Sequence, residues 1–433
     1  VTAVSAGQAT VVATSGAQSA TAVVTVAVPG ATPVNAWAVS PSGTTAGLKD
    51  VWGASATNVF AVGDNGTILH FDGASWTAAT STVTAQLNGV WGTSGTDIFA
   101  VGSSGTILHS DGTTWTAMTS GTSAYLYAVW GASATNVFAV GAGGTILRYD
   151  GARWSAMNSG TTRVLYGVWG ASATDVFAVG EYGTVLHYNG VQWSATQYQS
   201  WALTDAWGTS GTDVYVAEEW SGVLHFDGTS WTRMTNGPGN VGYGIWGSSA
   251  ADIYVSQYSG GISRFDGAAW SGVATGAATS NWMRGVWGTA VGSVYAAGDG
   301  GALVRGVRGA TLSVAAGSWA VTPQGNQAQV TATVRDAANA VVTGVPLTWT
   351  SSDAAIATVD GTGLATATGV PTATITATAT GGVSASVVLP VTVVANAVRV
   401  TPAGVALSGV NATQALGVEV RDGTGSVVVS PSV

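Results

Sequence analysis

Histidine is the side chain best suited to proton transfer or metal binding near neutral pH. The chain has four histidines, and they recur in one series: His70, His109, His187 and His225. Arg148 and Arg264 occupy the same position in two further repeats. A zinc site needs three or four ligands at one point, whereas this series supplies one side chain to each repeat. The pattern therefore predicts a structural or surface role for these histidines, and it predicts neither a metal site nor a catalytic base.

A second polar series precedes one predicted strand of each repeat: Asp97, Asp175, Asp213 and Asp252, with Asn58 and Asn136 at the same position. Asn replaces Asp in this series, so the position needs hydrogen bonding more than it needs charge. We expect hydrogen bonds within the turn there, as Asp and Asn commonly make.

The other polar and aromatic residues of interest lie in loops that differ from one repeat to the next. Variable loops rich in Tyr and Trp on a rigid scaffold are where binding residues are expected. Drift in a chain of this composition would more often leave Ser, Thr, Gly or Ala. The candidate ligand-binding residues are Lys49, Asn88, Tyr127, Tyr166, Glu181, Tyr182, Trp201, Glu218, Glu219, Trp220, Tyr243, Tyr258, Trp282 and Arg284.

Aromatic rings with scattered carboxylates and amides suit sugars, because the apolar face of a sugar stacks on a ring while its hydroxyls bond polar groups. The loops therefore predict a glycan or another cell-surface partner as the ligand. The acidic loops would also suit Ca²⁺, although no ligand spacing of the EF-hand type is present. No motif in the chain requires a cofactor.

A tandem repeat must position these side chains. Seven Trp-Gly pairs follow one another at intervals of 39, 39, 39, 38, 39 and 41 residues: Trp52, Trp91, Trp130, Trp169, Trp207, Trp246 and Trp287. A constant period of this length indicates one supersecondary unit stacked repeatedly. The repeat from Leu87 to Ser120 contains four short apolar or alternating runs separated by Gly and Asp turns, which predict four antiparallel strands. Four strands per period of about 40 residues are typical of a β-propeller blade.

A second tryptophan repeats in an Asp-Gly-x-x-Trp pattern, but the last repeat stops before it. Trp37 precedes Trp52 by 15 residues, the separation that also holds between Trp76 and Trp91. The segment that starts at Asn35 should therefore be the outer strand of the last blade. We predict an all-β fold, a seven-bladed propeller closed by its N-terminal strand, with the two tryptophan families packed between blades.

The loops between blades and between second and third strands share one face of such a propeller. We expect one ring of side chains, three residues before each Trp-Gly, to surround the channel mouth on that face: Lys49, Asn88, Tyr127, Tyr166, Thr204, Tyr243 and Arg284. The chain enters the propeller near Pro33 and leaves it near Gly306. Both points belong to the same blade and lie on the other face, with the loops between first and second strands. The flanking domains should therefore hold the propeller by the opposite face.

The flanks alternate Ala, Val, Thr and Gly with regular turn signals, which predicts a small β-sandwich. The residues LTWTSSDAAIATVDGTGLATA, ATITATA and VTV resemble the bacterial immunoglobulin-like domains of group 2. That resemblance implies an extracellular spacer or adhesin module at residues 310–395. Residues 1–30 match only the latter half of such a domain and residues 396–433 only its first part, around a propeller at 31–309. The chain is then a segment of a longer protein or a polymer subunit completed by neighbouring copies.

The Trp-Gly repeats are also similar to those of seven-bladed propellers in large secreted bacterial surface proteins, including the photosystem assembly-factor type. This likeness implies the fold and leaves the function open. Together with the immunoglobulin-like flanks, it implies an extracellular location at a bacterial cell surface.

The composition narrows the possible functions further. The chain has 433 residues, of which 8% are charged, a net charge of −9 and no cysteine. Without a basic stripe this charge disfavours nucleic acid, and the absence of disulfides leaves the compartment open. No apolar run of 18 residues is present, so the sequence predicts no membrane span in this segment.

Three functions are compatible with these patterns. We expect a surface-displayed binding or adhesion module whose propeller recognises a glycan or a surface protein. The alternative is a structural subunit or spacer of a bacterial surface filament, in contact with copies of itself. An enzyme is disfavoured, because the Asp-Gly-x-x-Trp turn is shorter than the Asp-box of sialidases and no Ser-His-Asp constellation, metal cluster or phosphate loop is present.

Overall fold

The computed structural model describes residues 7–15, 18–26, 36–198, 201–220, 222–235, 237–239, 241–275, 281–289, 292–307, 311–316, 327–335, 341–342, 345, 347–368, 372–379, 384–390, 397–401, 417–421 and 427–429. The domain boundaries expected after residues 30, 309 and 395 lie outside this set. No helix among the described residues is long and apolar enough to cross a membrane.

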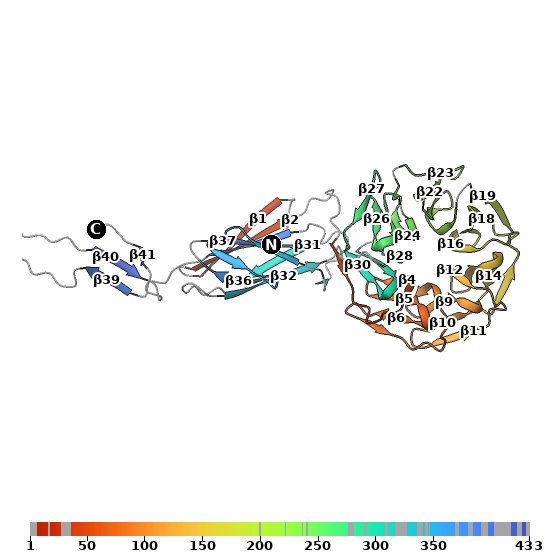
Figure 1. Cartoon of the computed structure of the whole chain (residues 1–433), viewed down its shortest axis with the longest axis horizontal. Coiled ribbons are helices and arrows are strands. Elements are labelled where there is room, and N and C mark those ends of the chain that lie inside the picture. Colours follow the sequence, from red (N-terminus) through yellow and green to blue (C-terminus); the bar gives the residue numbers. More distant parts are fainter. Residues whose placement is uncertain are drawn as a thin grey trace, which may run out of the picture.

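The described residues include seven four-stranded antiparallel sheets arranged as blades in a ring (Figure 1). The inner strands are β4 (Leu48–Ser55), β8 (Leu87–Ser94), β12 (Leu126–Ser133), β16 (Leu165–Ser172), β20 (Leu203–Ser210), β24 (Val241–Ser249) and β28 (Met283–Gly288). The second strands are β5 (Asn58–Gly63), β9 (Asp97–Gly102), β13 (Asn136–Gly141), β17 (Asp175–Gly180), β21 (Asp213–Glu218), β25 (Asp252–Gln257) and β29 (Ser293–Gly298). The third strands are β6 (Ile68–Phe71), β10 (Ile107–Ser110), β14 (Ile146–Tyr149), β18 (Thr184–Tyr188), β22 (Gly222–Phe226), β26 (Ile262–Phe265) and β30 (Leu303–Val307). The outer strands are β7 (Trp76–Ala78), β11 (Trp115–Met118), β15 (Trp154–Met157), β19 (Trp193–Gln197), β23 (Trp231–Arg233), β27 (Trp270–Val273) and β3 (Ala36–Val39).

Blade 7 is completed by the strand that precedes blade 1. Strand β3 pairs with β30 in antiparallel register, with Trp37 opposite Gly306 and Val39 opposite Val304. The prediction of seven blades closed by an N-terminal strand is therefore confirmed. Closure removes the long unpaired edge that an open array of sheets would expose.

The Trp-Gly pairs join each blade to the next. A Cβ atom added at Gly92 would lie 2.8 Å from the Trp52 ring of the preceding blade, and one at Gly131 would lie 2.5 Å from the Trp91 ring. The contact also closes the circle, since a Cβ at Gly53 would meet the ring of Trp287 at 2.7 Å. Each tryptophan therefore needs a glycine in the next blade.

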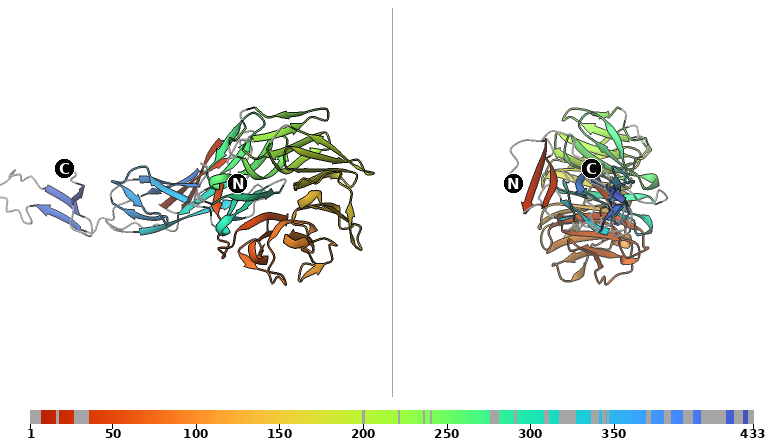
Figure 2. Two further views of the ribbon diagram at one scale, coloured as in Figure 1. Left: turned by 45° about the vertical axis from the view of Figure 1, so that its right-hand side comes forward. Right: turned by 90° about the vertical axis from the view of Figure 1, so that its left-hand side faces the viewer.

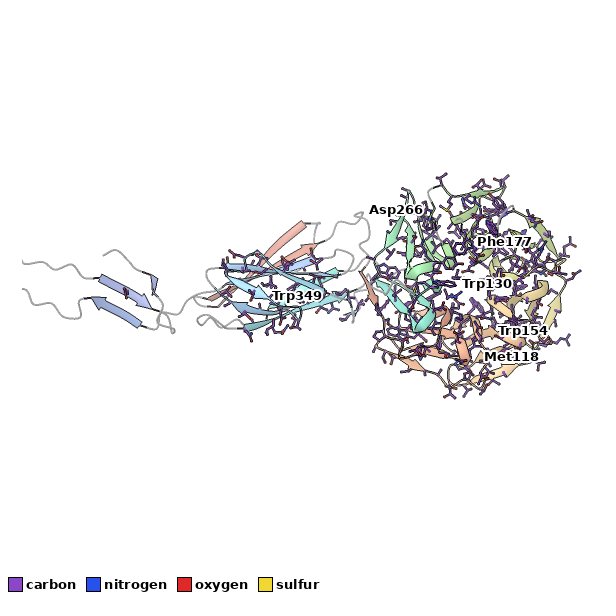
Figure 3. The ribbon with its side chains drawn as sticks, viewed as in Figure 1. Met118, Trp130, Trp154, Phe177, Asp266 and Trp349 are labelled. Atoms are coloured by element: carbon purple, nitrogen blue, oxygen red, sulfur yellow. The ribbon has the colours of Figure 1, made fainter. Side chains whose placement is uncertain are left out.

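The outer tryptophans pack in the opposite direction around the ring. Trp115 meets Phe60 of the preceding blade edge-on, with ring centroids 6.3 Å apart, and Trp154 meets Phe99 in the same way at 6.0 Å. Trp154 and Phe177, labelled in Figure 3, are buried in the propeller, and each such aromatic buries on the order of 150–250 Å². The two tryptophan families thus tie every blade to both neighbours, as the repeat predicted.

The region after the propeller is a two-sheet sandwich. One sheet contains β31 (Thr311–Ala316), β32 (Gln327–Arg335), β33 (Val341–Val342), β35 (Ala357–Val359) and β36 (Leu364–Ala367). The other has the order β1 (Gly7–Ser15), β2 (Gln18–Val26), β38 (Ser384–Pro390), β37 (Thr372–Ala379) and β34 (Leu347–Ser351). Alternate residues of β37 are buried in a core that includes Val330, Ile375 and the half-buried Trp349. The N-terminal hairpin thus extends a sheet formed by strands that follow the propeller.

A further three-stranded sheet contains β39 (Ala397–Thr401), β40 (Gly417–Arg421) and β41 (Val427–Val429). Its first two strands pair antiparallel in full register.

The sandwich is attached to blade 7. Val307, at the end of β30, packs against Val334 and Val342 in a small apolar cluster, and β3 begins opposite Val307. The chain therefore enters and leaves the propeller on the face where the turns between first and second strands lie, as expected. However, the described part of the sandwich lies beside the ring (Figure 1, Figure 2). It extends from the rim of blade 7 and does not hold the face, because the chain enters and leaves through β3 and β30, the two outermost strands of this blade.

Candidate functional site

The repeated histidines and arginines form part of the scaffold. In each blade the third-strand side chain bonds the residue twelve positions earlier, as in the 2.7 Å contact between His109 Nε2 and Asp97 Oδ1. The same pairing joins Arg148 Nε to Asn136 Oδ1 at 3.1 Å, and it is completed in blade 7 by Arg305 and Ser293. His109 also packs on the ring of Phe99, with centroids 4.6 Å apart.

These pairs confirm the structural role predicted for the histidine series. The hydrogen bonds expected at the turn for the acidic series are present as well, since Thr209 Oγ1 donates to Asp213 Oδ2 at 2.5 Å and Ser248 Oγ donates to Asp252 Oδ2 at 2.7 Å.

The side chain at the first residue of each second strand also bonds across the sheet to the third strand. His109 is paired with Phe99, so Asp97, two residues before Phe99, is its diagonal neighbour on the same face of the sheet. The constant separation of twelve residues between both series was the sequence signal. Among the described residues, no group of three or more His, Asp or Glu side chains is arranged to hold a metal ion.

The channel has a cavity of about 370 Å³ at its mouth, between the starts of the inner strands. All seven positions of the expected ring line this cavity: Lys49, Asn88, Tyr127, Tyr166, Thr204, Tyr243 and Arg284. Asp50, Asp205 and Glu219 line it as well. The face of the propeller with this mouth and the variable loops is called the variable face below.

Both cations at the mouth are already paired. Lys49 Nζ lies 3.2 Å from Asp64 Oδ1 and 3.2 Å from Asp299 Oδ1, while Arg284 Nη2 lies 2.8 Å from Asp299 Oδ2. Burial alone would raise the pKa of Asp299, but hydrogen bonds and charge from Arg284 and Lys49 lower that pKa below its ordinary value. The two cations are therefore neutralised by carboxylates of the same rim.

Two aspartates line the cavity at a position that the sequence analysis did not single out. Asp50 and Asp205 stand two residues before Trp-Gly, where the other repeats have Gly or Ala: Gly89, Ala128, Gly167, Gly244 and Gly285. Asp50 Oδ2 accepts a 2.9 Å hydrogen bond from the backbone N–H of Val90 in blade 2, and Asp205 Oδ2 accepts one of 3.1 Å from Ile245 in blade 6. A charged residue at a position otherwise reserved for small side chains was the available signal.

Burial governs the ionisation of both groups. It raises the pKa of Asp50 to about 7, against the opposing effect of backbone hydrogen bonds from Val90 and Val51. It raises the pKa of Asp205 to about 7 in the same way, and the charge of Asp50 raises it further. The two carboxyl groups therefore interact electrostatically across the channel.

Four aromatic residues of blades 5 to 7 form a cluster beside the mouth: Trp220, Tyr243, Tyr258 and Trp282, called the aromatic cluster below. Trp220 stacks on Tyr258 at 4.6 Å, and Trp282 meets Tyr258 edge-on at 4.9 Å. The guanidinium of Arg284 lies 4.1 Å from the centre of the Tyr243 ring. Trp220 is 55% exposed and Trp282 is 43% exposed.

The hydroxyl of Tyr258 donates to Glu219 Oε1 at 3.0 Å. Burial together with the neighbouring Tyr243 and Glu219 raises the pKa of Tyr258 above its ordinary value. The hydroxyl therefore stays protonated and holds the cluster to the rim.

Two exposed aromatics adopt a backbone conformation that bulky residues rarely take. Tyr182 has φ +54° and Trp220 has φ +72°, at the turn position where blades 3 and 7 have Gly143 and Gly300. Small polar Asn65 takes this conformation in blade 1. A bulky residue in the left-handed region costs of order 1–3 kcal/mol.

The remaining candidates lie around blades 3 to 5. The rings of Tyr127 and Tyr166 meet edge-on at 5.3 Å, and burial with the charge of Glu181 raises the pKa of Tyr166 to about 12. Glu181 Oε2 accepts a 3.0 Å hydrogen bond from the Val164 N–H.

Three further candidates have different surroundings. Tyr182 lies under the guanidinium of Arg163 at 4.3 Å, and Asn88 Nδ2 donates to the Leu126 carbonyl at 2.8 Å. Trp201 is 73% exposed.

Glu218 was wrong as a candidate for contact with a ligand. Its side chain is fully buried, and its Oε2 accepts a 2.9 Å hydrogen bond from Arg233 Nε on the outer strand of the same blade. Glu218 is the last residue of β21, and alternation along the strand turns it to the opposite side from Glu219. Its carboxylate stabilises blade 5 and does not face the cavity.

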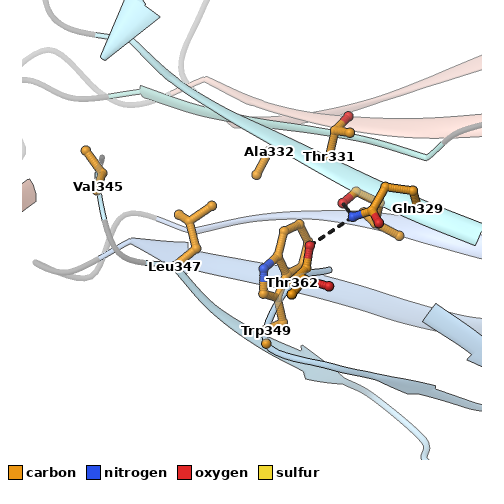
Figure 4. Close-up of a pocket in the computed structure, with 9 residues that line it drawn as sticks. Gln329, Thr331, Ala332, Val345, Leu347, Trp349 and Thr362 are labelled. Atoms are coloured by element: carbon orange, nitrogen blue, oxygen red, sulfur yellow. Dashed lines mark hydrogen bonds between the residues drawn. The ribbon is translucent and has the colours of Figure 1, made fainter. Parts of the chain in front are cut away.

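The sandwich has a surface groove of about 380 Å³ between β32 and β34 (Figure 4). Trp349 and Leu347 line its apolar side, and Gln329 Nε2 donates to the Thr362 carbonyl at 2.9 Å. Its lining side chains are uncharged. The charged and aromatic site is therefore on the propeller.

Comparison with known proteins supports both parts of the fold. The family model of the intimin immunoglobulin-like domain matches residues 328–381. This confirms the immunoglobulin-like character of the sandwich, while membership of group 2 stays a prediction. None of the curated protein sequences matches the chain.

Solved structures resemble the propeller. One described as YCF48 bound to D1 peptide has a TM-score of 0.52 and 16% identity, covering 65% of this chain and 99% of its own. YCF48 from Cyanidioschyzon merolae has a TM-score of 0.52 and 14% identity, with 62% and 98% covered. The WD40 propeller domain of Doa1 has a TM-score of 0.53 and 12% identity, with 63% and 96% covered. At these identities the likeness shows the propeller fold alone.

Proposed function

We propose that this chain is a bacterial cell-surface binding or adhesion module, and that the variable face of its propeller recognises a glycan. The observation that carries this proposal is the pair Tyr182 and Trp220, which are exposed although their backbone is in the left-handed region. Blades 3 and 7 use glycine at the same turn position. Bulky aromatics that cost folding energy in an exposed turn are explained by a role in binding.

A glycan fits the surroundings of these aromatics. Trp220 and Trp282 offer exposed ring faces for stacking, and Glu219 and Asn88 lie at the adjacent mouth to accept or donate hydrogen bonds to hydroxyls. The intimin-type match supports a cell-surface location, since such immunoglobulin-like domains are typical of bacterial surface proteins. A surface protein is the second possible partner, as the propeller described as bound to the D1 peptide illustrates for a different chain.

The proposal includes no catalytic step. Lys49 and Arg284, the cations at the mouth, are held by Asp64 and Asp299, and the histidines are engaged in the blade pairs. A binding role uses the exposed rings and the cavity without any proton transfer. The module therefore takes a ligand and leaves its bonds unchanged.

A spacer in a surface filament is the alternative function, and one observation favours it. The sheet of β1, β2, β38, β37 and β34 combines strands from before and after the propeller. The propeller is thus inserted between strands of one sheet, a geometry that would suit a bulky unit within a stalk. In that case the aromatic cluster would contact another copy of the chain.

A glycan array with the whole 433-residue chain tests the proposal. We expect wild type to bind a defined subset of glycans, and Trp220→Ala/Trp282→Ala to weaken that binding at least about tenfold, or about 1.4 kcal/mol. Val191→Ala is the matched control, because Val191 is 85% exposed on an outer hairpin turn of the opposite face. Loss of binding in the control, or no binding by folded wild type, would contradict a glycan site on the variable face. Self-association that the double variant abolishes would support the spacer.

A further inference from the structure

The cavity at the channel mouth has acidic groups on nearly opposite walls. Asp50 belongs to blade 1 and Asp205 to blade 5, so three blade steps separate them on the shorter way around the ring. Both line the same cavity of about 370 Å³, and Glu219 adds a third carboxylate at its edge. The position of Asp50 and Asp205 is taken by Gly or Ala in the other five repeats.

No ion pair neutralises these two groups within the described part of the chain. Lys49 is next to Asp50 in sequence, but its Nζ bonds Asp64 and Asp299, and Arg284 is likewise bonded to Asp299. Asp50 accepts backbone hydrogen bonds of 2.8 Å from Val51 and 2.9 Å from Val90. Asp205 likewise accepts backbone hydrogen bonds from Ala206 at 2.8 Å and from Ile245 at 3.1 Å. A carboxylate has about four acceptor sites, so each aspartate keeps acceptor capacity after its two bonds.

The walls of the cavity suit an organic cation. Tyr127 and Tyr166 line the same cavity as the carboxylates, and ring faces attract ammonium groups. Asn88 and Thr204 add an amide and a hydroxyl, which match the hydroxyl groups of a sugar. The volume is within the range of small-ligand sites, roughly 300–1,000 Å³.

We propose that this cavity binds the protonated amino group of an amino sugar at the end of the glycan that the variable face recognises, with Asp50 and Asp205 accepting its N–H donors. This rests on the proposed function and specifies its ligand. The amide and hydroxyl in the wall favour an amino sugar over a lysine side chain, because the lysine stem offers no hydroxyl partners.

Isothermal titration of the whole chain with two oligosaccharides of one skeleton tests this. The probes are fully de-N-acetylated chitotetraose, which has free amines, and fully N-acetylated chitotetraose, which has none. We expect wild type to bind the amine form at least about tenfold more tightly. In Asp50→Asn/Asp205→Asn the preference for the amine should disappear.

Asp150→Asn/Asp227→Asn is the matched control, because it removes the same two charges from exposed turns. Asn189 already occupies that turn position in blade 4 and accepts the same two backbone hydrogen bonds. The control should keep the full amine preference. If the preference for the amine form survives in Asp50→Asn/Asp205→Asn, the assignment of the amine to this cavity is overturned. It is also overturned if the control lowers that preference by the same factor.

The remaining outcomes separate this inference from the proposed function. Equal binding of both oligosaccharides by wild type, lost in Trp220→Ala/Trp282→Ala, would overturn the amine site while the glycan-binding face stands. Binding of neither oligosaccharide, with other glycans bound on the array, would have the same meaning. Binding of trilysine that requires Asp50 and Asp205, without binding of the amine oligosaccharide, would overturn the amino sugar in favour of a peptide.

Discussion

The two faces of the propeller place their carboxylates in opposite environments. On the face opposite the channel mouth, the aspartate of each Asp-Gly-x-x-Trp turn accepts two backbone hydrogen bonds, as Asp227 does from Thr229 and Ser230 at 2.8 Å. These bonds lower the pKa of Asp227 below its ordinary value. On the variable face, burial in the channel raises the pKa of Asp50 and Asp205 to about 7. One face thus uses these charges to stabilise turns, whereas the variable face also holds two carboxyl groups whose charged form is opposed by burial.

The two faces also differ in the residues that adopt the left-handed backbone conformation. The outer hairpin turns use glycine for the left-handed residue, as at Gly112 and Gly228. The variable face has Tyr182 and Trp220 in that conformation. The repeats that build the scaffold are thus locally consistent, whereas the variable face departs from local preference where a ligand is proposed.

The largest expected effect comes from breaking the scaffold that both faces share. In Gly131→Val the new side chain would meet the Trp91 ring, since a Cβ there lies 2.5 Å from it. We expect the free energy of unfolding to fall by about 2–3 kcal/mol, the usual cost of an overpacked core. Urea denaturation measures the change. Gly272→Ala is the control, because nothing lies within 4 Å of its Cβ, and an equal loss in that variant would contradict the tryptophan contact.

The next effect is on the pH dependence of the free energy of unfolding, to which the carboxyl groups of the two faces contribute in opposite directions. Asp50 and Asp205 have a pKa of about 7 in the folded protein, against 3.8 as the ordinary value. From about pH 4 to about pH 7 the folded state therefore holds more protons than the unfolded chain, so the free energy of unfolding should fall as pH rises. The turn aspartates have a lowered pKa, so their stabilisation is complete above pH 3.8 and is lost only below it.

Urea denaturation across this range measures the slope. We expect a loss of at least about 1 kcal/mol for each channel carboxyl, because one unit of difference between the folded and unfolded pKa corresponds to about 1.4 kcal/mol. Asp50→Asn/Asp205→Asn should flatten the curve, while the histidines present in both proteins contribute equally. A slope that is unchanged in this variant would contradict the raised pKa values.

The smallest effect concerns the turn conformation itself. Gly143 has φ +64° and open space around its Cβ, so Gly143→Tyr should lower the free energy of unfolding by about 1 kcal/mol through backbone strain alone. The reverse change, Tyr182→Gly, should leave the free energy of unfolding equal or raise it by up to about 1 kcal/mol, because loss of the contact with Arg163 offsets part of the relieved strain. Urea denaturation of both variants provides the comparison. A marked loss of stability in Tyr182→Gly would indicate a structural role for this aromatic in place of binding.

The repeat made much of this fold predictable. Positions such as Trp52 and Trp91 align without ambiguity, so equivalent positions could be identified by comparing the repeats with one another. The same comparison located the missing outer strand of blade 7 at Trp37. The same alignment placed Lys49, Tyr127 and Arg284 at equivalent positions, and the structure brings them to one cavity. Prediction was weaker where the environment depends on other blades, as for Asp50, whose burial and hydrogen bond to Val90 involve blade 2.

Glu218 and Glu219 are adjacent in sequence, but they have different surroundings that the sequence alone did not predict. The sequence by itself determined the four-strand unit, its number of copies, its closure and the ring of positions at the mouth, because period-2 alternation and turn residues act locally and the repeat multiplies them. Only the tertiary structure decided that Glu218 is buried against Arg233 while Glu219 reaches the cavity. It also decided that two aspartates share one channel and that the sandwich leaves from the rim. These features depend on which strands become neighbours, and burial, pKa and contact are set by neighbours that are distant in sequence.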